Sequence, residues 1–245
     1  MGKNLVVIPT YNELGNIREI IQADFDLGLD IDILIVDDNS KDGTGEVVDE
    51  LIASNKYNGR LHVMHRAGKL GLGTAYIQGF EWGLEKGYEV FISQDADFSH
   101  DPKYIKTMLE DIKTNDLVIG SRYVKGGAVK NWGLIRRMIS LGGSIYARTL
   151  LLTRVRDLTG GYNCYSKKAL GKINLKSIVS NGYCFQIEMK WRCALGKLKI
   201  KETPIVFEDR RVGQSKMSKK IFIEALLKVF VMGFSRKKFR SMLGN

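Results

Sequence analysis

Short apolar runs alternate with helical spacing along the first half of the chain. The runs predict buried parallel strands at Leu5–Ile8, Ile33–Val36, Leu61–Met64, Val90–Ile92 and Leu117–Ile119. Between them, apolar positions spaced three and four residues apart predict helices over Asn16–Asp24, Thr44–Ser54, Gly73–Glu85 and Pro102–Lys113. Repeated strand–helix–strand units predict an α/β fold with a doubly wound, mostly parallel sheet.

Polar side chains follow the ends of four of these predicted strands. They are Thr10–Glu13, Asp37–Ser40, Asp95–Asp97 and Ser121–Arg122. In an open α/β sheet, ligands bind beyond the carboxyl ends of the strands, so we expect the chemistry at this edge. Gly71-Leu72-Gly73 lacks the third glycine of a dinucleotide-binding loop, and the chain has no Walker loop. Neither of these two nucleotide sites is therefore predicted.

The pattern is looser after residue 119. Leu134–Leu152 is apolar but is interrupted by arginines and glycines, and Ile221–Phe234 contains Glu224 and Lys228 between basic flanks. Neither segment has the run of about 20 apolar residues that crosses a bilayer. Two interpretations of Ile221–Phe234 stay open: an amphipathic helix lying in the membrane interface, and a helix packed on the core.

The sign of the charge reverses between the two parts of the chain. Residues 1–119 carry 11 Lys and Arg against 21 Asp and Glu, a net charge of −10, whereas the remainder carries 27 against 6, a net charge of +21. The basic part predicts an anionic partner: nucleic acid, a membrane surface or a phosphorylated substrate. The chain lacks an interleaved aromatic RNA-binding pattern and a helix-turn-helix, so nucleic acid is disfavoured.

Cysteine use and the N-terminus bear on the cellular compartment. Three scattered cysteines predict neither a disulfide framework nor a zinc site. The apolar run that begins at Leu5 leaves no room for a signal peptide, so we expect a cytoplasmic protein.

Two acidic clusters are the strongest chemical candidates. Asp95 and Asp97 follow a predicted buried strand, where two carboxylates can hold a hard divalent cation that leaves sites open for phosphate oxygens. Ser99 and Asp101 have the alternative role of capping the next helix. Asp37 and Asp38 follow another strand, where a carboxylate can accept hydrogen bonds from ribose hydroxyls or a base edge.

The motifs resemble the inverting glycosyltransferases of family 2, which have the GT-A fold. The first-half motifs that carry this resemblance are Ile8–Glu13, Val36–Thr44, Gly71–Ala75, Gln94–Asp97 and Gly120–Arg122. The second-half segments Asn131–Ser140, Asp157–Gly160, Gly182–Glu188 and Phe207–Lys216 are similar to the dolichyl-phosphate (polyprenyl-phosphate) mannose synthases. The resemblance covers almost the whole chain in order, and its second-half motifs are the more specific ones.

The resemblance implies a role for each matched residue. Pro9, Tyr11, Glu13, Val36 and Asp38 would hold the nucleoside, and Asp95, Ala96 and Asp97 would meet the sugar nucleotide. The implied metal set is Asp95, Asp97 and Ser99, with Ser99 at the position of a glutamine ligand in some relatives. Arg122, Arg210 and Lys216 would bind phosphates or sugar, and Asp97, Arg122 and Arg210 form the implied catalytic set. Arg136 and Arg137 would hold either the acceptor phosphate or anionic lipid headgroups.

The implied organisation is a GT-A domain over residues 1–215 followed by a basic loop and amphipathic helix over 216–245. Within the domain, residues 1–119 form a nucleotide-sugar half and residues 120–215 an acceptor half. The implied enzyme sits peripherally on the cytoplasmic face of an anionic membrane, and the need for a small membrane subunit is left open.

The implied reaction is inverting transfer of mannose from GDP-mannose to dolichyl or polyprenyl phosphate, with Mg²⁺ or Mn²⁺. Transfer of glucose from UDP-glucose to the same lipid is the alternative. A lipid monophosphate is mostly dianionic at pH 7, so it needs no protein base to become a nucleophile. We therefore expect His100 and Glu188 to orient other groups rather than accept protons.

Overall fold

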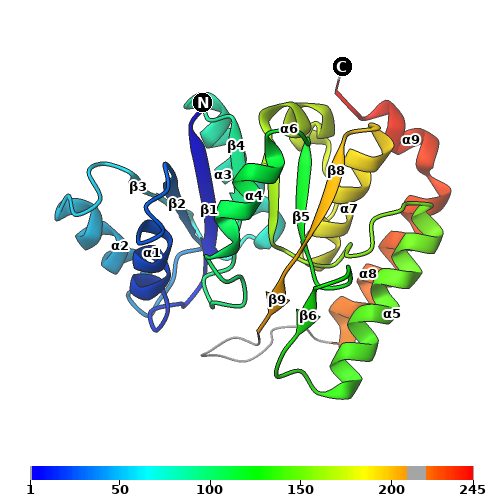
Figure 1. Ribbon diagram of the computed structural model, residues 1–245, viewed down its shortest axis with the longest axis horizontal. Helices are drawn as coiled ribbons and strands as arrows, with labels where there is room; N and C mark the ends of the chain where they lie inside the picture. Colours follow the sequence, from blue (N-terminus) through cyan, green and yellow to red (C-terminus); the bar gives the residue numbers. More distant parts are fainter. Residues whose placement is uncertain (1, 209–218, 245) are drawn as a thin grey trace.

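A computed structural model describes residues 2–208 and 219–244, and its centre is a seven-stranded sheet (Figure 1). The strand order is β3-β2-β1-β4-β7-β5-β8, and β6 and β9 form a separate two-stranded sheet. The strands are β1 (Asn4–Thr10), β2 (Asp32–Asp37), β3 (Leu61–His65), β4 (Val90–Ser93), β5 (Leu117–Ser121), β6 (Ala128–Val129), β7 (Asn163–Ser166), β8 (Ile200–Pro204) and β9 (Val206–Phe207). Only β7 runs antiparallel to its neighbours in the large sheet. The predicted mostly parallel α/β sheet is confirmed.

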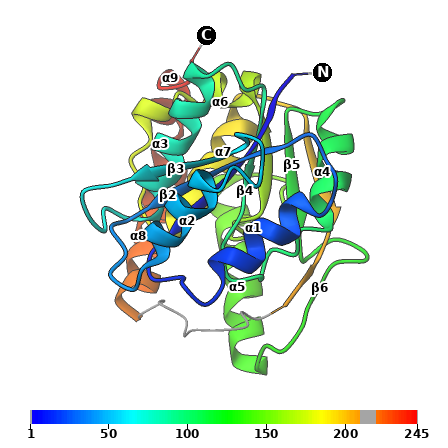
Figure 2. The ribbon, with the colours of Figure 1, turned by 90° about the vertical axis from the view of Figure 1, so that its left-hand side faces the viewer.

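Helices cover both faces of the large sheet (Figure 2). They are α1 (Ile17–Phe25), α2 (Thr44–Ala53), α3 (Leu72–Glu85), α4 (Tyr104–Ile112), α5 (Leu134–Leu151), α6 (Lys167–Ile173), α7 (Tyr183–Leu195), α8 (Lys219–Phe234) and α9 (Arg236–Ser241), with a 3₁₀ turn at Leu175–Ser177. Side chains of α1, α2 and α4 join the core on one face, and those of α3 and α5 to α9 join the core on the other.

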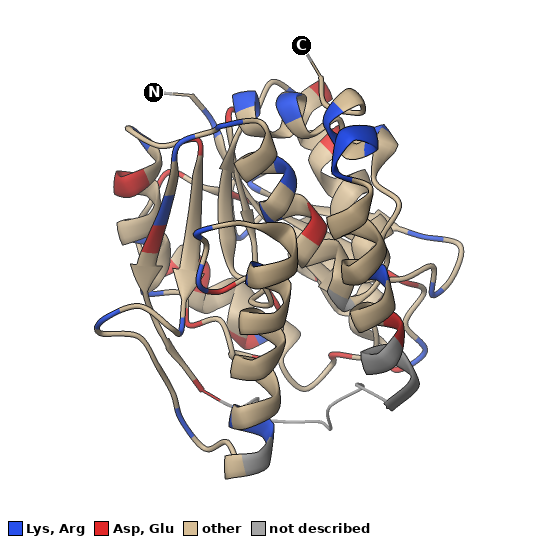
Figure 3. Cartoon of the chain, turned by 90° about the vertical axis from the view of Figure 1, so that its right-hand side faces the viewer, with Lys and Arg blue, Asp and Glu red and all other residues tan. Residues whose placement is uncertain are grey.

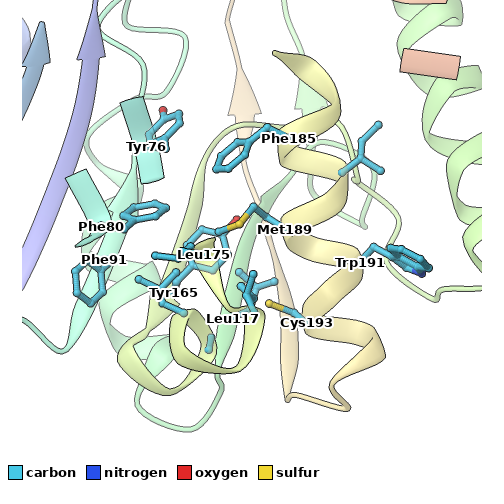
Figure 4. Close-up of a cluster of buried hydrophobic side chains, with 14 of the residues drawn as sticks. Tyr76, Phe80, Phe91, Leu117, Tyr165, Leu175, Phe185, Met189, Trp191 and Cys193 are labelled. Carbon is cyan, nitrogen blue, oxygen red and sulfur yellow. The ribbon is translucent and has the colours of Figure 1, made fainter. Parts of the chain in front are cut away.

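Alternation along each strand builds these two cores. On β1, Leu5 and Val7 point to one face, while Val6 and Ile8 point to the other, as the two-residue period of a strand requires. Figure 4 shows the first core, where aromatic rings from α3 and β4 pack towards α7. The rings of Tyr76 and Phe185 stack there with centroids 6.0 Å apart. This packing fixes α3 and α7 beneath the loops at the strand ends.

Each of the five predicted strands and four predicted helices is present, with boundaries within about two residues. The sequence did not predict β7, which enters the sheet between β4 and β5 from a position about 45 residues beyond β5. Its four residues, Asn163–Ser166, are too short and mixed to show a strand period. Because β7 joins the middle of the sheet, residues on both sides of position 119 build one sheet. The predicted boundary at 215 lies outside the described residues.

The pair α5 and α8 packs together beside the sheet. Gly233 permits this close approach, since a Cβ there would lie 3.0 Å from the Leu150 carbonyl oxygen. Val229 and Met232 of α8 are buried in the core, whereas Leu227, Phe230, Val231 and Phe234 are exposed. One face of this segment thus packs on the core, as one of the two interpretations predicts. Another face is exposed and apolar, and its contact with a membrane interface stays a prediction.

The exposed apolar face continues onto α5. Leu134, Met138, Ile139, Leu141 and Ile145 are exposed along it. Figure 3, which turns this side of the molecule to the viewer, shows long stretches of helix without charged residues. Among the described residues, no helix has the length and hydropathy of a membrane span.

Candidate active site at the carboxyl edge of the sheet

Two adjoining cavities lie where the parallel strands end. The β1 cavity has a volume of about 400 Å³, and its lining includes Pro9, Tyr11 and Asp38. The α5 cavity has a volume of about 200 Å³, and its lining includes Asp95, Ser99, Arg122 and Arg136. Leu72 and Ala225 line both cavities. The structure therefore brings part of the predicted nucleoside set to the same edge as part of the predicted acidic and basic set. The residues concerned are Pro9, Tyr11 and Asp38 in the β1 cavity and Asp95, Ser99, Arg122 and Arg136 in the α5 cavity.

Buried polar contacts hold the two loops that frame the β1 cavity. Asp37 accepts hydrogen bonds from the hydroxyls of Thr10 and Ser40, at 2.8 and 2.6 Å. Asn12 Oδ1 accepts a bond of 2.9 Å from the amide of Lys41. Asp37 and Asn12 thus join the loop after β1 to the loop after β2, so that Tyr11 and Asp38 face one cavity.

Two of the predicted nucleoside-binding residues, Val36 and Glu13, are not among the residues that line the β1 cavity. Val36 is fully buried within the hydrophobic core. Glu13 accepts a hydrogen bond of 3.1 Å from the Asn16 side chain at the start of α1. Direct contacts of Val36 and Glu13 with a nucleoside remain predictions.

Arg66 is a site residue that the sequence analysis missed. Its guanidinium forms a buried ion pair with Asp38 and donates a 2.6 Å hydrogen bond to the Thr74 hydroxyl. The side chains of Arg66 and Asp38 are 2% and 9% exposed, so the pair is largely shielded from water. Arg66 directly follows β3, and the rule that polar residues after strands carry function would have identified it.

The acidic motif after β4 adopts a constrained turn. Asp97 Oδ1 accepts a 3.1 Å hydrogen bond from the Ser99 amide, and the Tyr76 hydroxyl lies 3.2 Å from Asp95 Oδ1. Phe98, between Asp97 and Ser99, has a φ of 61°, a left-handed conformation that is uncommon for a bulky residue. Backbone strain of this kind persists where the surrounding structure enforces it, as at many ligand sites.

The donor atoms of this motif fit a hard divalent cation. Asp95 and Asp97 supply carboxylate oxygens and Ser99 a hydroxyl, the ligand types that Mg²⁺ and Mn²⁺ take. A Cβ added at Gly161 would lie 3.1 Å from His100 Cε1, so the glycine permits the close approach of the His100 ring beside this motif. The described residues contain no group of three or more His, Cys, Asp or Glu side chains able to hold a metal. Two carboxylates and a hydroxyl are fewer ligands than the six that Mg²⁺ takes, so oxygens of a bound phosphate or water would supply the others.

His100 is buried beside the acidic motif and orients it. The Asp95 amide donates a 2.9 Å hydrogen bond to His100 Nδ1. Burial lowers the pKa of His100, although the charges of Asp95 and Asp97 oppose that shift. The ring is therefore neutral near pH 7 and uses its Nδ1 lone pair for the backbone, so the 3.7 Å approach to Asp95 Oδ2 is not an ion pair.

Arg122 is held by a bidentate ion pair with Asp157. Its Nε and Nη2 donate to the two carboxylate oxygens at 2.8 and 2.7 Å. Burial by itself would raise the pKa of Asp157, but the charge and hydrogen bonds of Arg122 bring that pKa well below its usual range. Asp157 thus fixes the orientation in which Arg122 lines the α5 cavity.

Lys190 on α7 supports the same loop from behind. It is fully buried, and its Nζ donates hydrogen bonds to the carbonyl oxygens of Asp157 and Gly160. Burial lowers its pKa to about 8. A lysine in the middle of a helix gave no sequence signal for this role.

The remaining predicted cations lie in different environments. Arg136 lines the α5 cavity, with its guanidinium 4.3 Å from the Trp132 ring centroid. Arg137, the next residue on α5, is exposed. Arg210 and Lys216 lie outside the described residues.

Glu188 has a supporting position. It forms a buried 2.6 Å ion pair with Arg192 and accepts a 2.9 Å hydrogen bond from the Ser180 amide. This bond holds the segment that leads to Asn181 and Gly182, which line the β1 cavity.

Comparison with known proteins places this site in context. The model of glycosyl transferase family 2 matches residues 5–173. The polyprenol monophosphomannose synthase of Mycolicibacterium smegmatis is 44% identical over 94% of this chain and 87% of its own length. The undecaprenyl-phosphate mannosyltransferase of Micrococcus luteus is 45% identical over 95% of both chains.

Solved structures share the fold at low sequence identity. Glucosyl-3-phosphoglycerate synthase from Mycobacterium tuberculosis, crystallised with Mn²⁺ and UDP, aligns with a TM-score of 0.65 at 17% identity, over 96% of this chain and 80% of its own. A mannosyltransferase from Pyrobaculum calidifontis in complex with GDP-Man and Mn²⁺ aligns with a TM-score of 0.59 at 14% identity, over 97% and 64%.

Proposed function

The chain belongs to glycosyl transferase family 2, and from this premise we propose that it transfers mannose from GDP-mannose to polyprenyl or dolichyl phosphate. The observation that carries the proposal is the pair of adjoining cavities at one sheet edge. One has an aromatic residue and a carboxylate for a nucleoside, and the other is mostly apolar with two arginines. An enzyme that joins a nucleotide sugar to a lipid phosphate needs this combination.

The donor nucleoside occupies the β1 cavity in this proposal. Asp38, held by Arg66, accepts hydrogen bonds from the nucleoside, and Tyr11 offers a ring surface. Asp95 and Asp97, with Ser99 nearby, would hold Mg²⁺ or Mn²⁺, and the bound ion would supply positive charge to the leaving nucleoside diphosphate. Arg210 and Lys216 are proposed to complete the phosphate contacts.

The acceptor phosphate enters the α5 cavity. Arg122 and Arg136 bring positive charge to it, and Ile139, Tyr146 and Val229 provide apolar walls for the adjoining lipid. The phosphate is mostly dianionic at pH 7, so it attacks the anomeric carbon without giving up a proton to the protein. Neutral His100 accordingly stays an orienting group. Attack opposite the leaving group converts an α-linked donor into a β-linked product.

We propose that the protein binds peripherally to the cytoplasmic face of an anionic membrane. The exposed apolar face of α5 and α8 supports the membrane contact in this proposal. This face lies beside the α5 cavity, whose lining includes residues of both helices. Arg137 at the start of α5 and the basic helix α9 would contact anionic headgroups. A small membrane subunit could occupy the same face in place of lipid.

A donor comparison tests the proposal. The protein is incubated with undecaprenyl phosphate, Mg²⁺ and either GDP-[¹⁴C]mannose or UDP-[¹⁴C]glucose, and the lipid extract is counted. We expect the lipid to be labelled from GDP-mannose only. A β-mannosidase should then release the label from the lipid as mannose. Label from UDP-glucose alone would replace the mannose assignment by the glucose alternative, and label from neither would contradict the proposed reaction.

A further inference from the structure

Helix α8 contributes charged residues to the β1 cavity. Between residues 224 and 234, Glu224 and Lys228 are the only charged residues. They are spaced four apart and both line the cavity, together with Ala225. Apart from Glu224, the exposed side chains of this stretch are apolar, namely Leu227, Phe230, Val231 and Phe234. The polar side of α8 is thus the side that meets the donor cavity.

The ion pair between Glu224 and Lys228 is weak enough for Lys228 to exchange Glu224 for another anion. Lys228 Nζ lies 2.7 Å from Glu224 Oε1, and the side chains are 35% and 56% exposed. A pair of this type on a helix surface stabilises only weakly. A diphosphate offers the ammonium group several anionic oxygens and more negative charge than one carboxylate does. The Lys228 ammonium can therefore move from Glu224 to a bound diphosphate at little cost.

The charges that line the β1 cavity favour a role for Lys228 in binding a diphosphate. Its described lining contains two carboxylates, Asp38 and Glu224, and two lysines, Lys69 and Lys228. Lys69 lies over the Tyr11 ring, 4.1 Å from its centroid, at the proposed nucleoside end. A nucleoside diphosphate adds several negative charges to this lining, and Lys228 is placed to balance them.

Packing fixes the part of α8 that carries Lys228. The Tyr146 hydroxyl of α5 donates a 3.1 Å hydrogen bond to the Leu226 carbonyl oxygen. The sulfur atoms of Cys184 on α7 and Met232 on α8 lie 3.9 Å apart. The Lys228 backbone is therefore held against α5 and α7 at a constant position relative to the cavity.

We propose that Lys228 binds the diphosphate of the nucleotide sugar, leaving Glu224 when the donor enters. The inference rests on the proposed glycosyltransferase function and extends it, because it makes α8 part of the donor site. The same helix then presents one side to the nucleotide and an exposed apolar side to the surroundings.

The test compares nucleotide affinities of Lys228 variants. Lys228→Met keeps the length and packing of the stem but removes the charge. By calorimetry with Mg²⁺, we expect its Kd for GDP to rise about 10-fold, the effect of one charge-assisted hydrogen bond. Guanosine, followed by equilibrium dialysis, should bind as it does to the wild type, because it has no phosphate. Lys228→Arg should recover most of the GDP affinity.

Controls separate this role from a structural one. Lys106→Met, on the exposed side of α4, should leave the GDP affinity unchanged. An unchanged Kd for GDP in Lys228→Met, an equal loss of guanosine affinity, or no recovery in Lys228→Arg would each overturn the proposal. GDP and UDP are both titrated with the wild type first, and failure to bind either would count against the proposed function instead.

Discussion

Two pairs of buried, oppositely charged residues at this site position other groups. Arg66 fixes Asp38, and Asp157 fixes Arg122, each with both side chains below 10% exposure. Breaking such a pair leaves an uncompensated buried charge, which costs about 3–5 kcal/mol. Substituting one partner would therefore disturb the fold and the site together. The carboxylates of the Asp95–Asp97 motif offer a cleaner test of chemistry.

At the residue scale, we expect Asp97→Asn to lower mannosyl transfer by about 100-fold or more, because an amide is a poor substitute for a charged metal ligand. Turnover with Mg²⁺ and the thermal unfolding midpoint are measured side by side, and the midpoint should change little. Asp101→Asn is the matched control: Asp101 Oδ1 accepts from the Lys103 amide before α4, a capping contact outside the cavities. Full metal-dependent turnover in Asp97→Asn would refute the metal assignment.

Asp24 on helix α1 and Gln94, the residue after strand β4, form a buried polar pair directly before the acidic motif. Gln94 Nε2 donates a 3.1 Å hydrogen bond to Asp24 Oδ1. Asp24 Oδ2 and Gln94 Oε1 have no hydrogen-bond partner among the described residues. Burial raises the pKa of Asp24 from 3.8 to about 8. A proton on Asp24 gives the pair the donor that it lacks, so this carboxyl is neutral at pH 7.

This element-scale contact makes stability depend on pH. The folded state keeps the Asp24 proton up to about pH 8, whereas the unfolded chain releases it above about pH 4. The stabilisation is thus complete below about pH 4 and is lost as the pH rises to about 8. Asp24→Asn supplies the donor permanently. Its midpoint should equal that of the wild type near pH 4.5 and exceed it by several degrees at pH 8.

Thermal midpoints across this pH range, with exposed Asp30→Asn as control, check the expectation. The difference between Asp24→Asn and the wild type should widen as the pH rises. A difference that is constant from pH 4.5 to pH 8 would show that Asp24 is ionised throughout the range.

At the scale of the whole molecule, charge and apolar surface are distributed unevenly. The acidic first 119 residues contribute Pro9, Tyr11 and Asp38 to the β1 cavity, and the basic remainder includes the exposed apolar face of α5 and α8. Helix α9 adds Arg236, Lys237, Lys238 and Arg240 at the end of α8. An anionic surface would attract this side of the molecule and repel the other, which orients the α5 cavity towards lipid.

We therefore expect Phe230→Glu to weaken binding to vesicles of phosphatidylglycerol and phosphatidylcholine by about 10-fold, since it removes an exposed aromatic side chain that lipid would bury and adds a repelled charge. Sedimentation with vesicles gives the bound fraction, and 0.5 M NaCl should reduce it further for every variant. Ile52→Glu, at an exposed apolar position on α2, should bind as the wild type does. Equal binding by Phe230→Glu would exclude α8 from the membrane contact.

The sequence alone determined five of the six parallel strands of the large sheet, all except β8, and the edge that carries the site. Apolar runs of strand length and helical spacing are local signals, and polar residues directly after them mark the carboxyl ends. Tyr11, Asp38 and Asp95 could be assigned to one edge for this reason. The residues that line the cavities from that edge were thus open to prediction.

Only the tertiary structure decided which distant groups complete the site. The insertion of β7 between β4 and β5, the pairing of Arg66 with Asp38 and of Arg122 with Asp157, and the placement of Lys228 in the β1 cavity all join segments far apart in the chain. Such contacts depend on how helices and strands pack and on which charges that packing buries together. The local periodicity of the sequence cannot predict such long-range contacts, because it indicates only which face of an element is apolar.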